Sequence, residues 1–572
     1  MSRAMFVPLL LVWLGASCAP PPSSSSPASS PATSPAQPAR TLVVSVPSEP
    51  KTLAARIIGQ PATGGLIFSR RPFNADLALV DDQSNVYPYL AEGLPQLNTD
   101  SWKVFPDGTM DTTYRLKPNL VWHDGAPHTA DDFIFSWQVY STPQIGQTSS
   151  VPIRLIANVE APDERTVLIH WRQPYATAGA LQSLALSAPV GLPPLPRHIL
   201  GQSLEAGVDA LLNNSFWTSG YVGLGPYRLD RWEPGGFLEA SAFEHHALGA
   251  PRIQRMKILF MTDANTALAS ILSGETQVAA DQALPLPQAM TFLQQWPAGE
   301  GIMVPAFVSW LAAHFQGRSD YVNPAALQDV RVRQALAYAV DRVGINDSLY
   351  QGQFFVADSL FPPTSDLGRA ASAAVTKYPF DLNRSAQLMA DAGFTKGPGE
   401  IYLDRNGERF SAEVRASSGS VVDALGAIAS GWRQAGFDFQ EFVVPAAQAQ
   451  DLQVKSTYSG VQLSPTANGE SGLNSMGSGN VPTASNQWRG NAWDGYSNPE
   501  LDRLIGVFGM ALDLAQRTRA AADIAKLYST DVPAISLFFP VTPWVFTSEV
   551  SGPQPRPAEN NVAWNLHEWA LR

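Results

Sequence analysis

Leu120-Val-Trp-His-Asp-Gly-Ala-Pro-His-Thr-Ala-Asp-Asp-Phe133 is the stretch of this chain that most constrains its fold. Its Asp124-Gly125 pair predicts a tight turn. Thr129 is well placed as the N-cap of a helix, and the two aspartates that follow it would stabilise the first helical turn through the helix dipole. The aromatic residues beyond recur at the spacing of one helix face: Phe133, Trp137 and Tyr140. The stretch therefore predicts a turn that leads into a helix with an apolar face.

The sequence on either side of this stretch reads as short strands separated by turns. Residues 41–46 form a β-branched run that stops at Pro47. The Asp-Gly pair at residues 107–108 predicts a hairpin turn, and residues 112–116 alternate as a strand does. Residues 163–170 read as a further hairpin and strand. We therefore expect short strands to dominate the first part of the chain.

The second half of the chain changes to longer helices. Residues 329–342 form the clearest predicted helix, with Asp329 as its cap. The apolar residues of this helix are predicted to share one side: Val332, Leu336, Ala339 and Val343. Further helices are predicted over residues 381–394, 421–436 and about 499–528, and strands within residues 534–546. Residues 456–498 carry much Ser, Gly and Asn and predict extended loops.

The order of these motifs resembles that of the solute-binding proteins of bacterial ABC importers, in the oligopeptide and dipeptide class called family 5. The resemblance covers about residues 41–550. The motifs that carry it are Tyr89-Leu-Ala-Glu92, Asp107-Gly108, Tyr114-Arg-Leu116, Val121-Trp-His-Asp-Gly125, Thr129-Ala-Asp-Asp-Phe133, Gly223-Leu-Gly-Pro-Tyr227, Asp329-Val-Arg-Val-Arg-Gln-Ala-Leu336, Tyr338-Ala-Val-Asp-Arg342, the segment from Asp381 to Phe394, and Tyr496-Ser-Asn-Pro-Glu-Leu-Asp502.

The resemblance implies an α/β fold of the two-lobed periplasmic-binding-protein type. Hinge strands join the two lobes, the sheets are mixed, and the N-terminal lobe carries a small extra domain. The implied ranges are 41–75, 205–305 and 525–572 for lobe one (domain I), 76–204 for its extra domain (domain II), and 306–524 for lobe two (domain III).

The same resemblance implies a function without catalysis or cofactor. A monomer would capture a solute, oligopeptide or dipeptide, in a cleft between the lobes and deliver it to the permease subunits of an ABC importer. The alternatives on the same scaffold are an oligosaccharide, a nickel complex or a signalling peptide. A tethered secreted hydrolase is the enzyme alternative, but the sequence contains no Gly-x-Ser-x-Gly elbow.

The ligand site is implied only in outline. Related peptide binders hold the peptide ammonium group with an acidic residue in the region that corresponds here to residues 460–475. The expected aspartate is missing near the start of that region, and Glu470 is the candidate replacement. The following loop would lie near the cleft in a related protein, and its candidate ligand contacts are Trp488, Arg489, Asn491 and Trp493. Core packing is the alternative role for the two tryptophans.

Other chemically suggestive residues have structural interpretations that we prefer. His123 and His128 lie across a predicted turn and helix cap, without a nucleophile motif. The neighbours His245 and His246 would diverge if they lie in a strand, which argues against joint metal or haem binding. Charged residues of the 329–342 region are predicted to form ion pairs that hold one helix on its lobe: Arg331, Arg333, Asp341 and Arg342.

The N-terminal residues predict secretion and anchoring. Residues 1–17 read as a signal peptide with an apolar stretch of ten residues, too short to cross a bilayer. Cys18 follows as in a bacterial lipobox, although Gly15 stands where that pattern has leucine. Residues 18–40 then predict an extended linker, since residues 19–40 contain seven Pro, seven Ser and five Ala. We expect an extracytoplasmic protein tethered by a lipid on Cys18; an ordinary cleaved signal is the alternative.

Composition excludes several other classes of protein. The 572 residues sum to a net charge of −12, without a basic stripe that would neutralise nucleic-acid phosphates. Hydrophobic residues make up 45% of the chain, enough for a large core. Cys18 is the single cysteine, so an internal disulfide and a thiolate metal cluster are both excluded.

Overall fold

A computed structural model of the chain describes residues 40–56, 58, 67–82, 85–148, 150–182, 191–305, 309–417, 420–467, 469–555 and 561–572. Residues 40–572 form one compact unit. The predicted signal peptide, Cys18 and nearly all of the predicted linker therefore lie outside the described residues. Within the described residues, no helix is both long enough and apolar enough to cross a membrane.

A seven-stranded mixed sheet has the strand order β12-β21-β11-β1-β10-β9-β8. β1 lies near its centre and pairs in parallel with β10 and β11, while the other pairs are antiparallel. The strands are β1 (Thr41–Val46), β8 (Tyr227–Glu233), β9 (Phe237–Ala242), β10 (Arg255–Phe260), β11 (Val278–Ala279), β12 (Glu300–Pro305) and β21 (Val541–Phe546). Three helices accompany them: α1 (Ile67–Arg70), α5 (Ala264–Leu272) and α6 (Leu286–Gln295).

A four-stranded antiparallel sheet with the order β4-β5-β7-β6 occupies the region that contains the opening stretch. Its strands are β4 (Trp102–Val104), β5 (Met110–Arg115), β6 (Ile156–Asp163) and β7 (Thr166–Trp171). The helices of this region are α2 (Asp131–Tyr140), α3 (Arg197–Ala206) and α4 (Val208–Leu212). Two-stranded pairs complete the fold outside the larger sheets: β2 (Ala78–Val80) with β3 (Val86–Pro88), β15 (Thr395–Lys396) with β16 (Tyr402–Leu403), and β22 (Val550–Ser551) with β23 (Ala570–Leu571).

The opening stretch forms the predicted turn and helix, but the predicted cap is wrong. α2 begins at Asp131 with Ala130 at the N-cap position and without a side-chain cap. Instead, the buried carboxylate of Asp132 accepts hydrogen bonds from the Thr129 main-chain N–H (3.1 Å) and from Nδ1 of His128 (2.9 Å). Burial acts to raise the pKa of Asp132, but these hydrogen bonds outweigh it and lower that pKa. A buried carboxylate therefore holds this turn together.

A six-stranded mixed sheet has the order β14-β20-β13-β19-β17-β18. Its strands are β13 (Ser309–Phe315), β14 (Phe355–Val356), β17 (Ser411–Ala416), β18 (Asp438–Val443), β19 (Val461–Ala467) and β20 (Ala534–Phe539). Side chains alternate between its two faces. Leu311, Ala313 and Phe315 of β13 belong to one hydrophobic cluster, whereas Trp310 and Ala312 belong to another.

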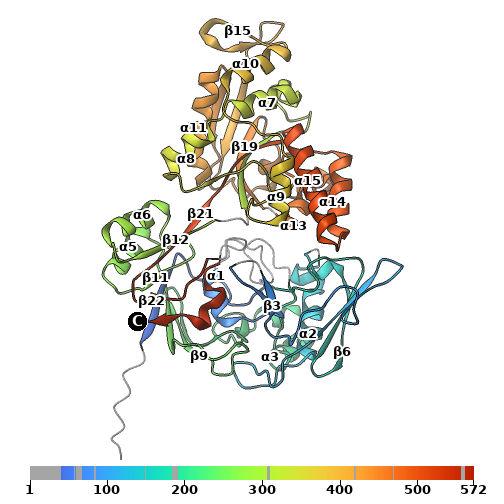
Figure 1. The fold of residues 1–572 in the computed structure, drawn as a ribbon, viewed down its shortest axis with the longest axis vertical. Helices are drawn as coiled ribbons and strands as arrows, with labels where there is room; N and C mark the ends of the chain where they lie inside the picture. Colours follow the sequence, from blue (N-terminus) through green and yellow to red (C-terminus); the bar gives the residue numbers. More distant parts are fainter. Residues whose placement is uncertain are drawn as a thin grey trace, which may run out of the picture. The chain divides into compact units, whose positions relative to one another are not determined.

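Helices cover both faces of this sheet (Figure 1). One face carries the cluster built with α7 (Val330–Tyr338), α8 (Arg342–Tyr350), α10 (Leu382–Asp391) and α11 (Ser420–Ala435). The other carries the cluster built with α9 (Asp366–Ala374), α13 (Gly469–Met476), α14 (Pro499–Met510) and α15 (Leu514–Asp531). The remaining short helix, α12 (Leu452–Ser456), precedes β19. The sheet therefore lies between two separate apolar cores.

Three expectations for the second half of the chain are corrected by the structure. α7 ends at Tyr338, so Val343 belongs to α8 and is 61% exposed rather than part of the α7 apolar face. The helix predicted over residues 499–528 is two helices, because Asp513 caps a new one by accepting from Gln516 N–H. Residues 456–498 contain β19 and α13 rather than loops alone.

The chain passes between the two large sheets twice. It leaves β12 for β13, and it returns from β20 to β21 at Pro540. β20 pairs with β13 and β14, so the chain is still in the six-stranded sheet up to Phe539. The division into three domains stays a prediction.

Candidate functional site

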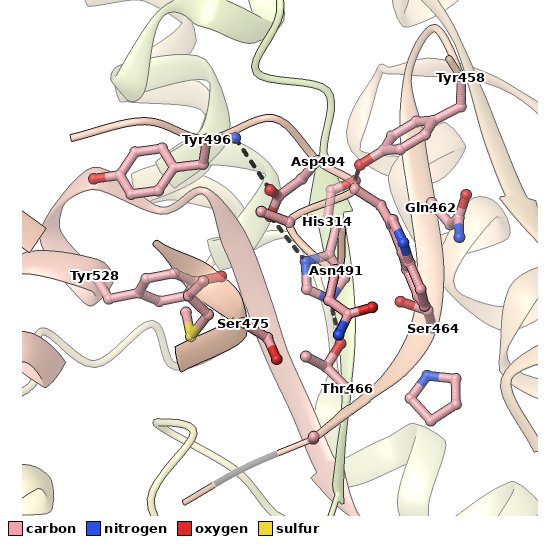
Figure 2. Close-up of a pocket in the computed structure, with 15 residues that line it drawn as sticks. His314, Tyr458, Gln462, Ser464, Thr466, Ser475, Asn491, Asp494, Tyr496 and Tyr528 are labelled. Carbon is pink, nitrogen blue, oxygen red and sulfur yellow. Dashed lines mark hydrogen bonds and ion pairs between the residues drawn. The ribbon is translucent and has the colours of Figure 1, made fainter. Parts of the chain in front are cut away.

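A pocket of about 220 Å³ lies on the face of the six-stranded sheet that carries α13, α14 and α15 (Figure 2). β13 and β19 supply its base, and α13, α15 and the loop of residues 491–496 supply its walls. Its lining residues are His314, Tyr458, Gln462, Ser464, Pro465, Thr466, Ala467, Ser475, Met476, Asn491, Ala492, Trp493, Asp494, Tyr496 and Tyr528. Several chain segments far apart in sequence therefore meet here.

A hydrogen-bonded triad joins the base of the pocket to its wall. His314 Nδ1 lies 3.2 Å from Oδ2 of Asp494, and His314 Nε2 lies 2.8 Å from Oγ1 of Thr466. The second carboxylate oxygen, Oδ1, accepts from the Tyr496 main-chain N–H at 3.1 Å. The His314 and Asp494 side chains are each only 12% exposed. Both oxygens of this carboxylate are thus engaged by the protein itself.

Arg318 attaches the wall loop to the end of β13. Its Nη1 donates to the carbonyl oxygen of Pro482 at 2.8 Å, and its Nη2 donates to those of Trp493, at 3.0 Å, and Ser456. Its Nε donates to Gln316 Oε1 at 3.1 Å. Partial burial lowers the pKa of Arg318 from its ordinary value, but a guanidinium remains charged in proteins. One half-buried cation therefore holds the chain segments that carry Asn491 and Trp493.

The tyrosines of the pocket are uncharged. Burial, and to a lesser extent the nearby carboxylate of Asp494, raises the pKa of both Tyr458 and Tyr528 well above the ordinary value. Burial also raises the pKa of Tyr496, whose hydroxyl donates to Oδ2 of Asp531 at 2.6 Å. These rings therefore present apolar faces and neutral hydroxyl groups.

Two cations lie behind the aromatic walls without lining the pocket. Arg415 stacks 4.9 Å from the ring centroid of Tyr458, and its Nε and Nη2 donate to Gln462 Oε1 at 3.1 and 2.9 Å. Lys455 Nζ lies 5.4 Å from the ring centroid of Trp493. Because a guanidinium only donates hydrogen bonds, the atom of Gln462 that faces Arg415 is the amide oxygen. The amide nitrogen of Gln462, Nε2, therefore points away from Arg415.

β19 presents an open main-chain edge beside this pocket. β13 pairs with all of β19, whereas β17 pairs only with its first two residues. Gln316 N–H donates to the Gly460 carbonyl oxygen, so the even-numbered residues of this segment are the ones that hydrogen-bond to β13. In an antiparallel pair alternate residues do so, and the odd-numbered residues of β19 therefore direct their main-chain groups away from β13. In the described part of the chain, no strand pairs with Pro465 or Ala467 on that side. The Pro465 carbonyl and the Ala467 N–H therefore belong to an unpaired edge.

Two of the predicted ligand contacts line the pocket and two do not. Asn491 and Trp493 line it. Trp488 instead meets the ring of Tyr321 edge-on, with centroids 6.4 Å apart, and Arg489 is exposed on the same loop. Glu470 is the second residue of α13, but its side chain lies outside the described residues.

The lining residues that sequence reasoning missed are mainly the triad and the tyrosines. Asp494 and Tyr496 directly follow the predicted Trp493, so extending the candidate loop by three residues would have found them. His314 gives no such signal, because it comes from β13, 180 residues before Asp494, and β13 reaches the site by pairing with β19. Its position depends on sheet pairing and not on local sequence.

His123 and His246 lie outside the pocket and make hydrogen bonds inside the fold. His123 is buried between Gly223 N–H and the Gly225 carbonyl, and burial lowers its pKa to about 4. His246 lies in the turn after β9, not in a strand, and its Nε2 is 2.7 Å from the Tyr89 hydroxyl. Burial lowers the pKa of His246 to about 3. Among the residues that the structure describes, no group of three or more His, Cys, Asp or Glu side chains is arranged to hold a metal ion.

The predicted ion pairs around α7 are correct in part. Arg331 pairs with Asp329, and Arg342 pairs with Asp358 at 3.2 Å. Arg333 instead donates to main-chain carbonyl groups, including those of Asp531 and Val532. Asp341 caps α8 by accepting from Gly344 N–H at 2.9 Å. These charges fix helices on the sheet.

Comparison with known proteins gives consistent matches. The chain is 24% identical over 388 residues to the oligopeptide-binding protein AppA of Bacillus subtilis (strain 168), a match that covers 66% of this chain and 65% of that protein. The chain thus spans slightly less than two thirds of that relative's length. It is 26% identical over 326 residues to the dipeptide-binding protein of Escherichia coli (strain K12), covering 54% of this chain and 56% of that protein.

Solved structures share the fold. The oligopeptide binding protein from Thermus thermophilus, complexed with a pentapeptide, has a TM-score of 0.70 at 22% identity and covers 93% of this chain and 96% of that chain. NikZ from Campylobacter jejuni, in complex with Ni(L-His), has a TM-score of 0.72 at 22% identity and covers 93% and 99%. This likeness confirms the predicted α/β fold class.

The family itself is identified by a match over residues 92–498, which is more than half of the chain. That range includes β13, β19 and the wall loop up to residue 496, so the pocket lies almost entirely inside it. The chain therefore belongs to the bacterial extracellular solute-binding proteins of family 5, which are transport components and not enzymes.

Proposed function

We propose that this protein is the solute-binding component of an ABC importer and that its solute is a short peptide. The single observation that carries the peptide assignment is the open edge of β19 beside the pocket of residues 314, 458, 462, 464–467, 475–476, 491–494, 496 and 528. Such an edge has main-chain donors and acceptors but no partner strand. An extended peptide can pair with them through the donors and acceptors of its own main chain. Sugars and metal complexes have no matching repeat of donors and acceptors.

Several relatives are peptide-binding proteins, which supports this ligand class, and one similar structure holds a nickel complex. The Bacillus and Escherichia proteins are named for oligopeptide and dipeptide binding, and the Thermus structure holds a pentapeptide. NikZ instead holds Ni(L-His), so a nickel complex is the rival ligand. Among the described residues, His314 is the one histidine that lines the pocket, and both of its ring nitrogens already have partners, Asp494 and Thr466. This geometry favours peptide over a histidine-ligated metal.

Delivery requires the protein to lie outside the cytoplasm. We propose that residues 1–17 direct secretion, that a lipid on Cys18 anchors the protein, and that residues 18–40 act as the linker. The family consists of extracellular proteins, which supports this location. Lobe one (domain I with its extra domain II) and lobe two (domain III) would then close on the peptide and present it to the permease subunits.

The decisive experiment is mass spectrometry of small molecules released by denaturation from purified residues 41–572, followed by calorimetry with synthetic di- to pentapeptides. We expect a spread of short peptides and measurable binding. One defined sugar or nickel complex in their place would overturn the peptide assignment.

A backbone variant tests the role of the β19 edge. Ala467→Pro removes the main-chain N–H at the open edge, whereas Ala467→Ser keeps it and serves as the matched control. We expect the proline variant to lose about tenfold or more in peptide affinity, since a hydrogen bond and its neighbours on the strand are disrupted. Equal affinity of the two variants, with both folded by circular dichroism, would show that the edge does not bind peptide.

A further inference from the structure

We infer that the pocket is a subsite for one uncharged aromatic side chain of the bound peptide, a tyrosine, phenylalanine or tryptophan. This inference rests on the peptide binding proposed above and specifies it. Its starting point is size: the pocket holds about 220 Å³. Sites that enclose a whole drug-sized ligand measure about 300–1,000 Å³. The pocket therefore suits one group of a larger ligand.

The apolar part of the lining is mostly aromatic. Rings reach the pocket from three places: Tyr458 before β19, Trp493 and Tyr496 on the wall loop, and Tyr528 on α15. Figure 2 shows the three tyrosines. Met476 of α13 adds a polarisable sulfur. Aromatic rings pack favourably edge-to-face or offset against one another, and thioethers contact ring edges well. This lining offers a flat ligand group more contact than it offers a branched aliphatic one.

Neutral hydrogen-bonding groups complete the lining. The Gln462 amide is oriented by Arg415, which occupies its oxygen and leaves Nε2 as a donor. Ser464 lies on the same face of β19 and is buried, while Asn491 is exposed on the wall loop. These groups can satisfy one polar atom, such as a phenol hydroxyl or an indole N–H. The pocket thus combines ring faces with a few polar contacts.

Among the described residues of this pocket, every charged side chain that could pair with a charged ligand group already has a partner in the protein. The carboxylate of Asp494 already accepts from His314 and from Tyr496 N–H. Arg318 and Arg415 donate to protein carbonyl and amide oxygens. Moving an ammonium or carboxylate from water to such a site costs free energy that no new ion pair offsets. The lining therefore disfavours lysine, arginine, aspartate and glutamate side chains of the peptide.

A peptide paired with the open edge of β19 would place a side chain at this pocket. A strand added beside Pro465 and Ala467 directs alternate side chains to the two faces of the sheet. One face carries Gln462, Ser464 and Thr466, which line the pocket. A peptide held by its main chain would thus place every second side chain on the pocket side. One of these positions becomes the selective one.

The test uses tetra-alanine peptides in which each position in turn is Tyr, Phe, Lys or Glu, with binding to residues 41–572 measured by calorimetry. We expect one position at which Tyr and Phe bind about tenfold or more tightly than Ala, and at which Lys and Glu do not, because burying an aromatic ring gains well over a tenfold factor.

Two tryptophan variants locate the preference. Trp493 lines the pocket and Trp488 lies on the same loop outside it, so Trp488→Ala is the matched control for Trp493→Ala. We expect Trp493→Ala to reduce the aromatic preference about tenfold while all-alanine peptide binding is kept, and Trp488→Ala to leave both unchanged. Trp493→Phe should restore much of the preference, which separates lost contact from misfolding.

Each result has one meaning. If peptides bind but aromatic residues gain nothing at any position, or if Lys is preferred, the aromatic subsite is wrong and peptide binding stands. If the preference persists in Trp493→Ala, the side chain lies elsewhere and the inference is again wrong. If no peptide binds at all, the proposed function fails and the subsite fails with it.

Discussion

Replacing Arg318 with methionine tests whether one cation holds the pocket wall in place. Met keeps an apolar stem of similar length but removes the donors that reach the carbonyl oxygens of Pro482, Trp493 and Ser456 and the side chain of Gln316. The substitution also removes the guanidinium that stacks 4.9 Å from the ring centroid of Tyr321. We expect residues 480–496 to loosen and peptide affinity to fall.

The size of the effect follows from these contacts. Hydrogen bonds that involve a charged group contribute about 1.5–3 kcal/mol each, so a simple sum over four acceptors would reach roughly 6–12 kcal/mol. Arg318 is only half-buried, water can replace part of what is lost, and single substitutions rarely cost more than about 4–5 kcal/mol. We therefore expect a loss of about 2–4 kcal/mol in the free energy of unfolding.

Hydrogen exchange read by mass spectrometry, together with urea denaturation, measures both effects. Arg318→Lys should recover part of the stability, since it keeps a positive charge without the planar fork. Arg489→Met, on the exposed part of the same loop, is the control and should change little. Unchanged exchange over residues 480–496 in Arg318→Met, with stability within about 0.5 kcal/mol of the wild type, would refute the reasoning.

Three further predictions concern other parts of the chain. The folded pKa values of His123 and His246, about 4 and about 3, lie below the ordinary value of 6.5, so the unfolded chain binds more protons and stability falls as pH drops below about 6.5. By pH 4.5 each histidine should cost on the order of 2–3 kcal/mol, and His246→Gln should flatten this dependence in urea titrations at several pH values. Asp132 has a lowered pKa, so its stabilisation is present above about pH 3.9 and is lost below it. Asp132→Asn should cost about 1.5–3 kcal/mol at pH 7, and its difference from the wild type should shrink at pH 3; a constant difference would contradict the role of the charge. Cys18→Ala should move the full-length protein from the membrane to the soluble fraction of cells that express it; continued membrane fractionation would exclude the lipid anchor.

Local sequence signals predicted several elements correctly because their causes are local. Asp329 and Asp381 cap α7 and α10, since a carboxylate needs only the next main-chain N–H groups to do so. The family motifs likewise predicted the fold class, and two residues of the wall loop, Asn491 and Trp493, line the pocket.

Predictions that depended on packing were wrong. The apolar face of α7 does not continue to Val343, because α7 ends at Tyr338 and α8 begins at Arg342. The spacing of apolar residues in the sequence does not reveal this break between the two helices. Residues 456–498 look polar and loop-like, yet β19 forms there because β13 supplies its hydrogen-bonding partner. Strand formation in such a segment depends on a neighbour distant in the chain.

The pocket shows the same division most clearly. The wall loop carries its tryptophans and Asn491 in one short stretch of sequence, so these residues could be proposed as ligand contacts from the sequence. His314 and Tyr528 come from β13 and α15, and they meet Asp494 only because the antiparallel register of β13 with β19 and the packing of α15 on the same face bring them together. Long-range register and packing leave no local pattern, so only the tertiary structure decides them.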